Sequence, residues 1–337
     1  MLDRGRQPGL GRVVAVLSEG CALSESQEIR LSSKVPQSAG GASLLDYLTQ
    51  RFRYQSEAQW QASIEAGRVE IGGLPVDVQS RVRAGEIVTF VQVRREPEPE
   101  VPLRVIEDRP GWAVVDKPAG MPCHSDGAFV RSTVTFQLAE RLGLERVLLV
   151  HRIDRETSGL LVVAKTRSAS RALHQQFEAG TVEKVYEALL EGCVEWDRQR
   201  VEAPIARHPS SSVSMRRAIV AEPDGKPAVT ELEVLRRSAD RSWVRARIET
   251  GRAHQIRVHC ESLGHPVVGD KLYGRSDAEF LDWVRRVKEA DGELDVGLPA
   301  RFHLLHARTL CFDDPESGER LRFESSPDRL ERGFATD

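Results

Sequence analysis

The chain has 337 residues, of which 40% are hydrophobic and 29% charged, and its formal net charge at pH 7 is -3. This length favours two domains, one of them small, with enough mass for a full core. The charge excludes wholesale polycation behaviour, because a protein that binds nucleic acid through charge alone carries a clear basic excess. Any basic surface must therefore be local.

The cysteines lie far apart and form no CxxC pair; they are Cys21, Cys123, Cys193, Cys260 and Cys311. This spacing fits neither a disulfide framework nor a zinc site, so we expect a reducing, cytoplasmic environment. The N-terminal segment has arginines but no apolar core followed by a small-residue cleavage site, and no run reaches the ~18 apolar residues of a membrane span. We therefore expect a protein that is neither exported nor embedded in a membrane.

The N-terminal part changes its pattern at Ser43. Residues 1–40 are rich in glycine, serine and isolated charges, and we treat them as a leader of uncertain order. Residues 43–52 and 56–67 predict two helices, residues 68–76 a strand with a Gly-Gly turn, and residues 81–93 a last strand.

Residues 41–94 thus resemble the small alpha-L RNA-binding domain. Two features depart from that domain: the run from Ser43 to Asp46 lacks the arginine that usually opens its first helix, and Gly72-Gly73 replaces the usual Asn-Gly turn. The alternative is a generic two-helix appendage.

Residues 95–103 alternate proline and glutamate, which predicts an extended, solvated linker. Beyond it, short strands are predicted in residues 112–116, 146–152, 160–165, 182–192, 228–237 and 242–250, with helices in 133–143, 168–180 and 253–264. Strands without regular helical crossovers predict an α+β domain in residues 104–330, with a mixed, largely antiparallel sheet and flanking helices. Residues 275–300, charged and weakly helical, are expected to form a surface insertion.

The most informative segment is HRIDRETSG, residues 151–159. Its charged and ionisable side chains lie in a connection between two apolar strands, where a rigid sheet commonly presents reactive groups. The alternative is a solvated surface ion-pair cluster, which the charge pattern alone favours.

The longer segment HRIDRETSGLLVVAKT resembles the signature of the RluA-type pseudouridine synthases, which usually has leucine at the position of Ile153. Four further segments resemble motifs of the same family in the same order: DKPAGMPCH (116–124), KVYEALLEG (184–192), TGRAHQIRVHCESLGHPVVGDKLYG (250–274) and LLHARTLCFDDPESGE (304–319). The resemblance covers residues 105–330. The Cys123 and His124 pair departs from the commonest apolar residues of its motif.

The resemblance implies an enzyme that flips specific uridines out of structured RNA and isomerises them to pseudouridine without a metal, nucleotide or other cofactor. It assigns the catalytic carboxylate to Asp154, a base-stacking tyrosine to Tyr186, an apolar pocket residue to Leu310 and an intercalating cation to Arg152. The residues do not choose between nucleophilic attack and deprotonation as the role of the carboxylate.

Arg257 is our candidate for the cation that keeps Asp154 ionised under a bound base. Residues 253–263 are helical by pattern, with Thr250 as a candidate cap, and this helix places His254 and His259 on different faces. The two histidines therefore do not predict a joint metal site, and lone helical histidines are more often structural.

Several basic residues are candidates for RNA contacts. Arg155, Arg252, His254 and Lys117 stand within the motifs, and alternation places Arg245 and Arg247 on one strand face. Arg245 and Arg247 would form a local basic track together with four further residues, Arg207, His208, Arg216 and Arg217. For any single one of these residues, a solvated side chain on a strand, without an RNA contact, is an equally good interpretation.

Two other functions remain open at this point. One is a catalytically silent RNA-binding protein of the same fold, and the other is a hydrolase using Ser158 with a histidine, although Thr157-Ser158-Gly159 lacks the GxSxG elbow. Within the synthase interpretation, an added RNA-binding domain favours ribosomal RNA over tRNA, whereas the target position and the oligomeric state cannot be read from the residues.

Overall fold

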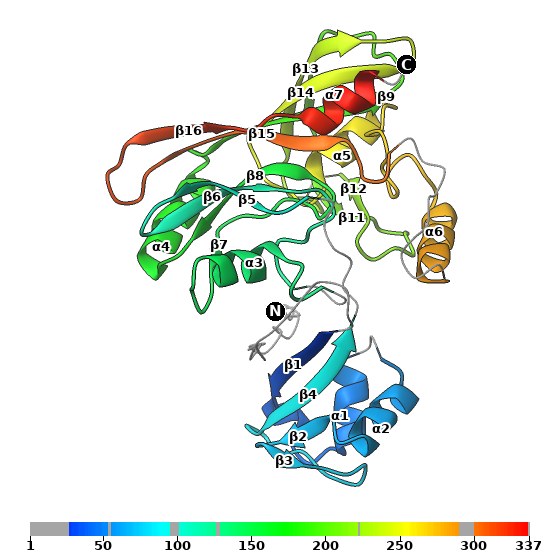
Figure 1. Ribbon diagram of the computed structural model, residues 1–337. Helices are drawn as coiled ribbons and strands as arrows, with labels where there is room; N and C mark the ends of the chain where they lie inside the picture. The colour runs from blue at the N-terminus through cyan, green and yellow to red at the C-terminus, as the bar shows by residue number, and fades with distance from the viewer. Residues whose placement is uncertain are drawn as a thin grey trace. The chain divides into compact units, whose positions relative to one another are not determined.

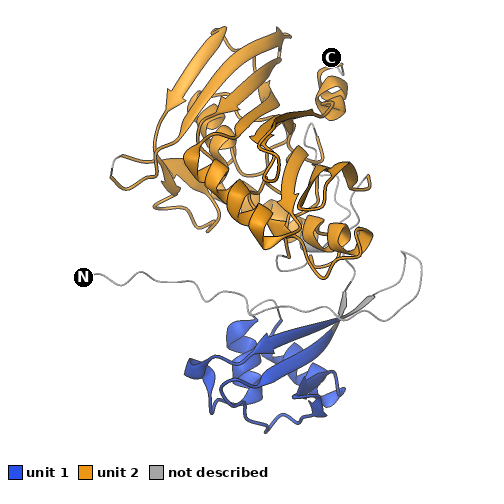
Figure 2. Ribbon diagram, turned by 90° about the vertical axis from the view of Figure 1, so that its left-hand side faces the viewer, with its two compact units in different colours: residues 1–96 blue, residues 97–337 orange. Residues whose placement is uncertain are grey.

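The computed structural model describes residues 27–52, 55–94, 101–125, 129–221, 223–289 and 300–335. The chain divides into two compact units, residues 1–96 and 97–337 (Figure 2). The division falls inside the predicted linker at residues 95–103, of which residues 95–100 lie outside the described part of the chain. None of the described helices is long and apolar enough to cross a membrane.

The first unit combines two helices with a four-stranded antiparallel sheet in the order β1-β4-β2-β3 (Figure 1). Its elements are β1 (Gln27–Lys34), the 3-10 helix η1 (Gln37–Ala39), α1 (Leu44–Arg51), α2 (Glu57–Glu65), β2 (Val69–Ile71), β3 (Leu74–Pro75) and β4 (Ile87–Arg94). The helices and strands predicted in residues 43–93 are confirmed by α1, α2, β2, β3 and β4.

Local chemistry starts both helices. The Ser43 hydroxyl accepts a hydrogen bond from the backbone amide of Asp46 in α1, and Ser56 forms a reciprocal capping box with Gln59 in α2. Between β2 and β3 the predicted glycine turn has φ values of 60° and 83° at its two residues, a left-handed backbone that a two-residue hairpin turn requires. In the core, Trp60 of α2 lies edge to face with Phe90 of β4, with ring centroids 5.1 Å apart.

The structure corrects the leader predicted at residues 1–40. β1 pairs with β4 along its whole length, and Leu31 and Val35 are buried. A strand with so few apolar residues gives too weak a periodic signal to be separated from a loop without its partner. Residues 1–26 lie outside the described residues.

The second unit confirms the predicted α+β class, with a mixed, mostly antiparallel ten-stranded sheet. Its main path runs β10-β13-β14-β9-β15-β8-β6-β5, with β16 paired to β15 and β7 paired to β8. The strands are β5 (Arg104–Asp108), β6 (Trp112–Lys117), β7 (Leu148–Leu149), β8 (Ser158–Ala164), β9 (Glu183–Glu191), β10 (Arg198–Glu202), β13 (Val229–Arg237), β14 (Arg241–Ile248), β15 (Leu305–Asp313) and β16 (Arg320–Glu324).

Helices flank this sheet, and a separate two-stranded hairpin lies outside it. The hairpin consists of β11 (Ile205–Arg207) and β12 (Arg217–Ile219), and the helices are α3 (Val134–Arg141), α4 (Arg167–Ala179), α5 (Gln255–Ser262), α6 (Asp277–Glu289) and α7 (Asp328–Ala335). α6 occupies the predicted insertion at residues 275–300, and α7 carries the domain beyond its predicted end at residue 330.

Successive side chains of a strand point to opposite faces of the sheet, so neighbouring residues pack in different hydrophobic clusters. On β6, Ala113 and Val115 pack in the cluster that includes α3 and α5, whereas Trp112 and Val114 pack with α4. A third cluster joins the sheet to α7, whose buried Phe334 lies 5.9 Å from the ring of Trp243. The segment that follows β7 runs between the first two clusters, because Val150 packs with α4 and Ile153 packs with α3 and α5.

The central join of the sheet is short. β8 and β15 run parallel through two residue pairs, Ser158 opposite His306 and Gly159 opposite Ala307. A Cβ atom on Gly159 would lie 2.3 Å from the carbonyl oxygen of Ala307, and the φ of this glycine is +105°. The glycine of the TSG sequence is therefore required by both backbone conformation and space.

Two predicted elements are shorter than expected. The strand predicted at residues 146–152 is reduced to β7, because residues 151–157 leave the sheet as a loop. The helix predicted at residues 253–264 begins at Gln255, and the hydroxyl of Thr250 donates to the Gln255 side chain at 2.8 Å instead of capping the helix.

Candidate active site

The loop between β7 and β8 is anchored at its first residue. Nε2 of His151 accepts a hydrogen bond from the Val162 amide at 3.1 Å, and the imidazole stacks on Phe177 with ring centroids 4.5 Å apart. Burial, with a smaller effect of Lys184, lowers the pKa of His151 to about 3. The ring is therefore neutral, as an accepting Nε2 requires, and it fixes the path of the loop that carries Asp154.

Lys117, the last residue of β6, connects the loop that carries Asp154 to the turn that follows β6. Its side chain is fully buried, and its ammonium group donates to the carbonyl oxygens of Pro118, Met121 and Arg155 at 2.8–2.9 Å. Burial lowers the pKa of Lys117 to about 8, and the three acceptors match the three N–H bonds of the ammonium form. The RNA contact predicted for Lys117 is wrong, because this side chain does not reach the surface.

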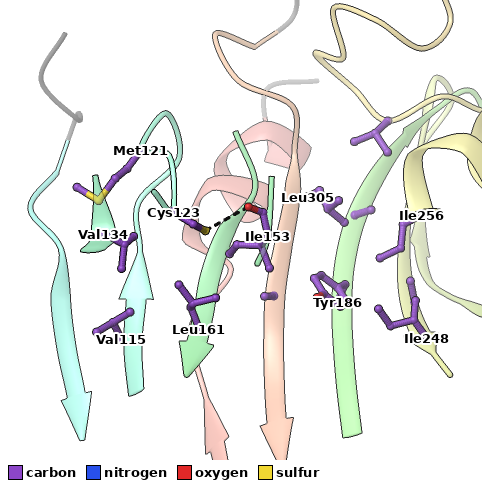
Figure 3. Packing of buried hydrophobic residues seen from close by; sticks show 14 of the residues in the cluster. Val115, Met121, Cys123, Val134, Ile153, Leu161, Tyr186, Ile248, Ile256 and Leu305 are labelled. Atoms are coloured by element: carbon purple, nitrogen blue, oxygen red, sulfur yellow. Dashed lines mark hydrogen bonds between the residues drawn. The ribbon is translucent and has the colours of Figure 1, made fainter. Parts of the chain in front are cut away.

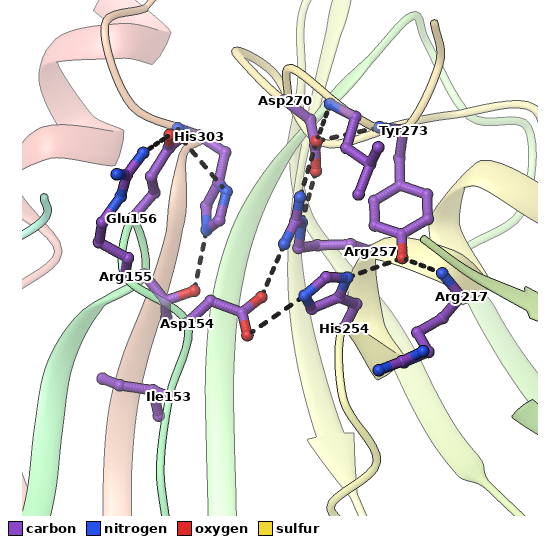
Figure 4. A network of polar contacts seen from close by, with 12 residues as sticks. Ile153, Asp154, Arg155, Glu156, Arg217, His254, Arg257, Asp270, Tyr273 and His303 are labelled. Atoms are coloured by element: carbon purple, nitrogen blue, oxygen red, sulfur yellow. Dashed lines mark hydrogen bonds and ion pairs between the residues drawn. The ribbon is translucent and has the colours of Figure 1, made fainter. Parts of the chain in front are cut away.

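Asp154 lies in a buried cluster of charges (Figure 4). Nη1 of Arg257 in α5 donates to Oδ2 of Asp154 at 2.8 Å. Nε and Nη2 of the same guanidinium donate to Oδ2 and Oδ1 of Asp270 at 2.6 and 2.9 Å. Asp270 thus occupies one side of the planar fork and orients the remaining donor toward Asp154.

The carboxyl group of Asp154 is held in its ionised form. Burial by itself would raise the pKa of Asp154, but the neighbouring His254, Arg257 and His303 outweigh it and lower the pKa to about 2. The Asp154 side chain keeps 23% exposure, whereas that of Asp270 has 0%. Of the two carboxylates on the arginine, Asp154 is the one that a substrate can reach.

An apolar wall containing Tyr186 adjoins the carboxylate. Tyr186 of β9 belongs to the cluster that includes Ile153, Cys123 and Leu305, with the Cys123 thiol directed to the carbonyl oxygen of Ile153 (Figure 3). Burial and the charge of Asp154 raise the pKa of Tyr186 well above its ordinary value. A protonated, planar ring at this position is suited to stack on a nucleobase.

His254 approaches Asp154 from the start of α5. Its Nε2 lies 4.0 Å from Oδ1 of Asp154, and its Nδ1 lies 2.8 Å from the hydroxyl of Tyr273. Burial lowers the pKa of His254 to about 4, so the ring is neutral at pH 7. His254, which was predicted to contact RNA, thus lies inside the site and not on an open surface that could bind phosphate.

Comparison with known proteins relates this geometry to a family. Residues 111–262 match the RNA pseudouridylate synthase family. An uncharacterized RNA pseudouridine synthase of Synechocystis sp. is 36% identical over 236 residues, which span 68% of this chain and 79% of that protein. The chain belongs to the RluA-type family of RNA pseudouridine synthases.

Relatives whose names specify the ribosomal large subunit are similar to this chain over a larger share of its length than the Synechocystis protein is. The ribosomal large subunit pseudouridine synthase D of Neisseria meningitidis serogroup B is 33% identical over 314 residues, covering 90% of this chain and 80% of that protein. The enzyme of the same name from Pseudomonas aeruginosa is 31% identical and covers 89% of this chain and 93% of its own length. The solved structure of human RNA pseudouridylate synthase domain containing 1 has a TM-score of 0.53 and 26% identity over 72% of this chain and 98% of that one.

The exposed arginines of this pseudouridine synthase flank Asp154 on its own loop. Arg152 and Arg155 are exposed, and the guanidinium of Arg155 lies 5.6 Å from the ring centroid of Phe129. Arg252 is half-buried, and its Nε donates to the carbonyl oxygen of Pro227 at 2.9 Å. The first two keep their guanidinium groups accessible to RNA.

The predicted basic strand face turns away from the synthase site. Arg245 and Arg247 do share a face of β14, but Arg245 is opposite Glu187, the neighbour of Tyr186 that points to the other side of β9. Arg245 also lies 3.7 Å from Glu187 and 3.5 Å from Glu233, which neutralise it. Neither arginine belongs with Asp154.

The pocket residue predicted at Leu310 is also in another place. Leu310 packs with Trp112 and Phe312 in the cluster beneath α4, whereas Leu305 packs with Tyr186. A β-bulge follows Ala307 and changes the register of β15. The assignment of Leu310 rested on the family resemblance, and the clusters place Leu305, not Leu310, beside Tyr186.

The structure supplies the Ser-His pair that the hydrolase alternative needs, but buries it. The Ser158 hydroxyl lies 2.9 Å from Nδ1 of His306, and Nε2 of that ring lies 3.4 Å from the carbonyl oxygen of Ser325. Both side chains are almost fully buried and connect β8 to β15. This pair holds the sheet together and offers no accessible nucleophile.

Sequence reasoning missed the residues that support Asp154 and Arg257. Asp270 and Tyr273 stand in the quoted segment 250–274, where an aspartate in a largely apolar run was the available signal. Beside Asp154, the Thr157 hydroxyl lies 2.8 Å from Nε2 of His303, and Glu156 accepts from Nζ of Lys271 at 2.7 Å. Within the described ranges, no group of histidine, cysteine, aspartate and glutamate side chains could hold a metal ion.

Proposed function

We propose that this synthase converts uridines of large-subunit ribosomal RNA to pseudouridine, with Asp154 as the catalytic carboxylate. The observation that carries the assignment is a partly exposed carboxylate held ionised by Arg257 at 2.8 Å, and close enough to Tyr186 for its charge to raise the pKa of that phenol. Large-subunit RNA is favoured because relatives named for it match 89% and 90% of the chain, which is more than the second unit alone.

The reaction needs a carboxylate and a closed pocket. The N1–C1′ bond of the uridine breaks, the uracil turns, and a C5–C1′ bond forms, after which the C5 proton moves to the ring nitrogen. No electron or group is gained or lost. An ionised Asp154 supports this chemistry either by attacking the nucleoside or by taking a proton from the ribose as the glycosidic bond weakens.

Other residues hold the flipped nucleotide. Extruding a base from a stack costs a few kcal/mol, and a planar guanidinium such as that of Arg152 can fill the vacated space. Tyr186 stacks on the uracil, and Leu305 borders the same wall. Arg155 and Arg252 contact the RNA backbone on either side.

A catalytically silent RNA-binding protein would have no use for the buried charges. Burying a guanidinium with two carboxylates carries a large desolvation cost, and a binding surface gains nothing from it. The arrangement of Arg257, Asp154 and Asp270 therefore favours the enzyme.

The test is to incubate the purified protein with unmodified ribosomal and transfer RNA transcripts, without added metal or nucleotide, and to map pseudouridine at each position. Asp154→Asn keeps the size of the side chain and removes its charge, so we expect it to form no detectable product. Asp197→Asn changes an aspartate whose side chain is 88% exposed, and it should behave as the native protein.

Product on large-subunit RNA from the native protein alone supports both parts of the proposal. Product on tRNA alone would contradict the choice of RNA. Product from Asp154→Asn at a rate near that of Asp197→Asn would contradict the catalytic role.

A further inference from the structure

We propose that His254 is a positioning residue that presents an uncharged Nε2–H donor to Oδ1 of Asp154, the oxygen that reacts, and that Tyr273 fixes the proton on Nε2. The proposal rests on the catalytic role proposed above for Asp154. It adds an assignment of the reacting oxygen and a chain of contacts from the β11–β12 hairpin to that oxygen.

The two oxygens of Asp154 differ in their surroundings. Oδ2 accepts the hydrogen bond of Arg257 at 2.8 Å. Throughout the described residues, no hydrogen bond reaches Oδ1, and Nε2 of His254 faces it from 4.0 Å. An oxygen that carries a charge-assisted hydrogen bond is a poorer nucleophile and base than a free one. Oδ1 is therefore the oxygen that can meet the nucleoside.

The contacts of Tyr273 favour one tautomer of His254. The Tyr273 hydroxyl accepts a hydrogen bond from the backbone amide of Arg217 in β12 at 3.0 Å and lies 2.8 Å from Nδ1 of His254 (Figure 4). An amide can only donate, so the hydroxyl's own hydrogen is available for Nδ1. With Nδ1 accepting, the proton of the neutral ring resides on Nε2, the nitrogen that faces Asp154.

The backbone of His254 supports a functional role. Among the described residues, it is the single non-glycine with a left-handed backbone, at φ 60°. This conformation costs a non-glycine residue ~1 kcal/mol and persists where the surroundings impose it, commonly at functional sites. Here it directs the ring toward Asp154 at the first turn of α5.

Charges of both signs surround the ring and leave it neutral. The titratable and charged groups that face it are Asp154, Asp270, Arg257, Arg217 and Tyr273. Burial and the arginines lower the pKa of His254, and the aspartates oppose them. A neutral donor can stabilise charge on Oδ1 without neutralising it. Because 4.0 Å exceeds a hydrogen bond, this donor engages Oδ1, or the ribose atom bound there, only when uridine fills the site.

Three variants test the proposal in the full chain. Tyr273→Phe removes the hydroxyl and keeps the ring that lies 4.8 Å from the Arg257 guanidinium carbon. His254→Gly removes the donor without straining the left-handed backbone, and His254→Gln restores a non-ionisable N–H donor. The readouts are the single-turnover rate of pseudouridine formation at saturating RNA and the dissociation constant for the same RNA.

We expect Tyr273→Phe and His254→Gly to slow the single-turnover rate by about tenfold to a hundredfold, and His254→Gln to recover it to within about fivefold of native. The RNA dissociation constant should change by less than about threefold in all three, which a general structural defect would not produce. Tyr273→Phe tests the proposal even if the glycine variant folds poorly.

The proposal is overturned if His254→Gly is as fast as native, if His254→Gln is as slow as His254→Gly, or if the whole loss lies in RNA affinity. Asp154→Asn, measured alongside, separates this proposal from the proposed function. An active Asp154→Asn refutes the catalytic carboxylate, whereas an inactive Asp154→Asn with a fully active His254→Gly refutes only the role of His254.

Discussion

Arg257 joins two carboxylates with a single guanidinium, and this depends on the shape of the group as well as its charge. A lysine offers one compact ammonium group and cannot bind Asp270 through two nitrogens while donating to Asp154 with a third. Arg257→Lys therefore separates the effect of charge from that of geometry.

We expect Arg257→Lys to lower the single-turnover rate by about tenfold or more and to change its pH dependence. In the native protein the lowered pKa keeps Asp154 ionised down to about pH 2, so this group gives no loss of activity between pH 5 and 8. When the cation is held less closely, burial raises the pKa, and activity is lost as the pH falls through the new value. The measurement is the single-turnover rate across that range.

Arg245→Lys provides the matched control, because Arg245 lies on the opposite face of the sheet. It should leave both the rate and the pH profile unchanged. A profile of Arg257→Lys that matches the native one would show that charge alone is sufficient.

At this scale the sequence motifs identified residues that act through local chemistry and failed where burial decides. Asp154 and Arg257 were paired correctly, since a buried carboxylate needs a fixed cation to stay ionised. Lys117 was misassigned because its three carbonyl partners come from two separate turns. Leu310 was assigned from the family resemblance alone, and the cluster in which it packs depends on Trp112 and other residues far along the chain.

Among the elements, β8 and β15 depend on the absence of a side chain at residue 159. Gly159→Ala would place a methyl group 2.3 Å from the Ala307 carbonyl oxygen and impose a residue at φ +105°. We expect a loss of about 3 kcal/mol or more in the free energy of unfolding, because backbone atoms cannot move aside as side chains do. Equilibrium unfolding in urea measures it.

Gly143→Ala is the control, since Gly143 also has a positive φ, at +64°, but a Cβ there meets no atom within 4 Å. Its cost should be about 1 kcal/mol. Equal losses in the two variants would mean that backbone strain, and not the close approach of β15, explains the glycine.

Element prediction succeeded where a segment carries its own signal. The two helices of the first unit have serine caps in sequence, and the strands of the sheet have long apolar runs. β1 and the shortened β7 depend instead on partners far along the chain. The pairing of β1 with β4, more than fifty residues away, cannot be seen in either segment alone.

For the whole molecule, the two units allow a division of labour to be tested. If residues 27–94 help to capture RNA, deleting residues 1–96 should raise the RNA dissociation constant by about tenfold or more, because the second unit then binds alone. The single-turnover rate at saturating RNA should stay within about threefold of native, since Asp154 and its partners all belong to the second unit.

Both quantities are measured on the same ribosomal RNA fragment. Unchanged affinity would remove the RNA-capture hypothesis for the first unit. A lost rate with retained affinity would show that the first unit contributes to the chemical step.

The α+β class was predictable from the order of strands and helices, but the arrangement of the sheet was not. Nothing local in residues 158–159 or 306–307 indicates that these segments run side by side in parallel. That join connects one side of the sheet, β5, β6 and β8, to the other side, which begins with β15 and β9. It brings the loop of Asp154 within reach of Arg257 and His254 from α5.

The brevity of this join has a mechanical consequence. β15 is held to β9 through six residue pairs and β8 to β6 through six, but β15 is held to β8 through only two. Local openings start where few contacts hold elements together, so we expect the sheet to open first at its narrowest seam. The loop that carries Asp154 ends where that seam begins, so the carboxylate proposed to react lies beside the join with the fewest residue pairs along the main path of the sheet.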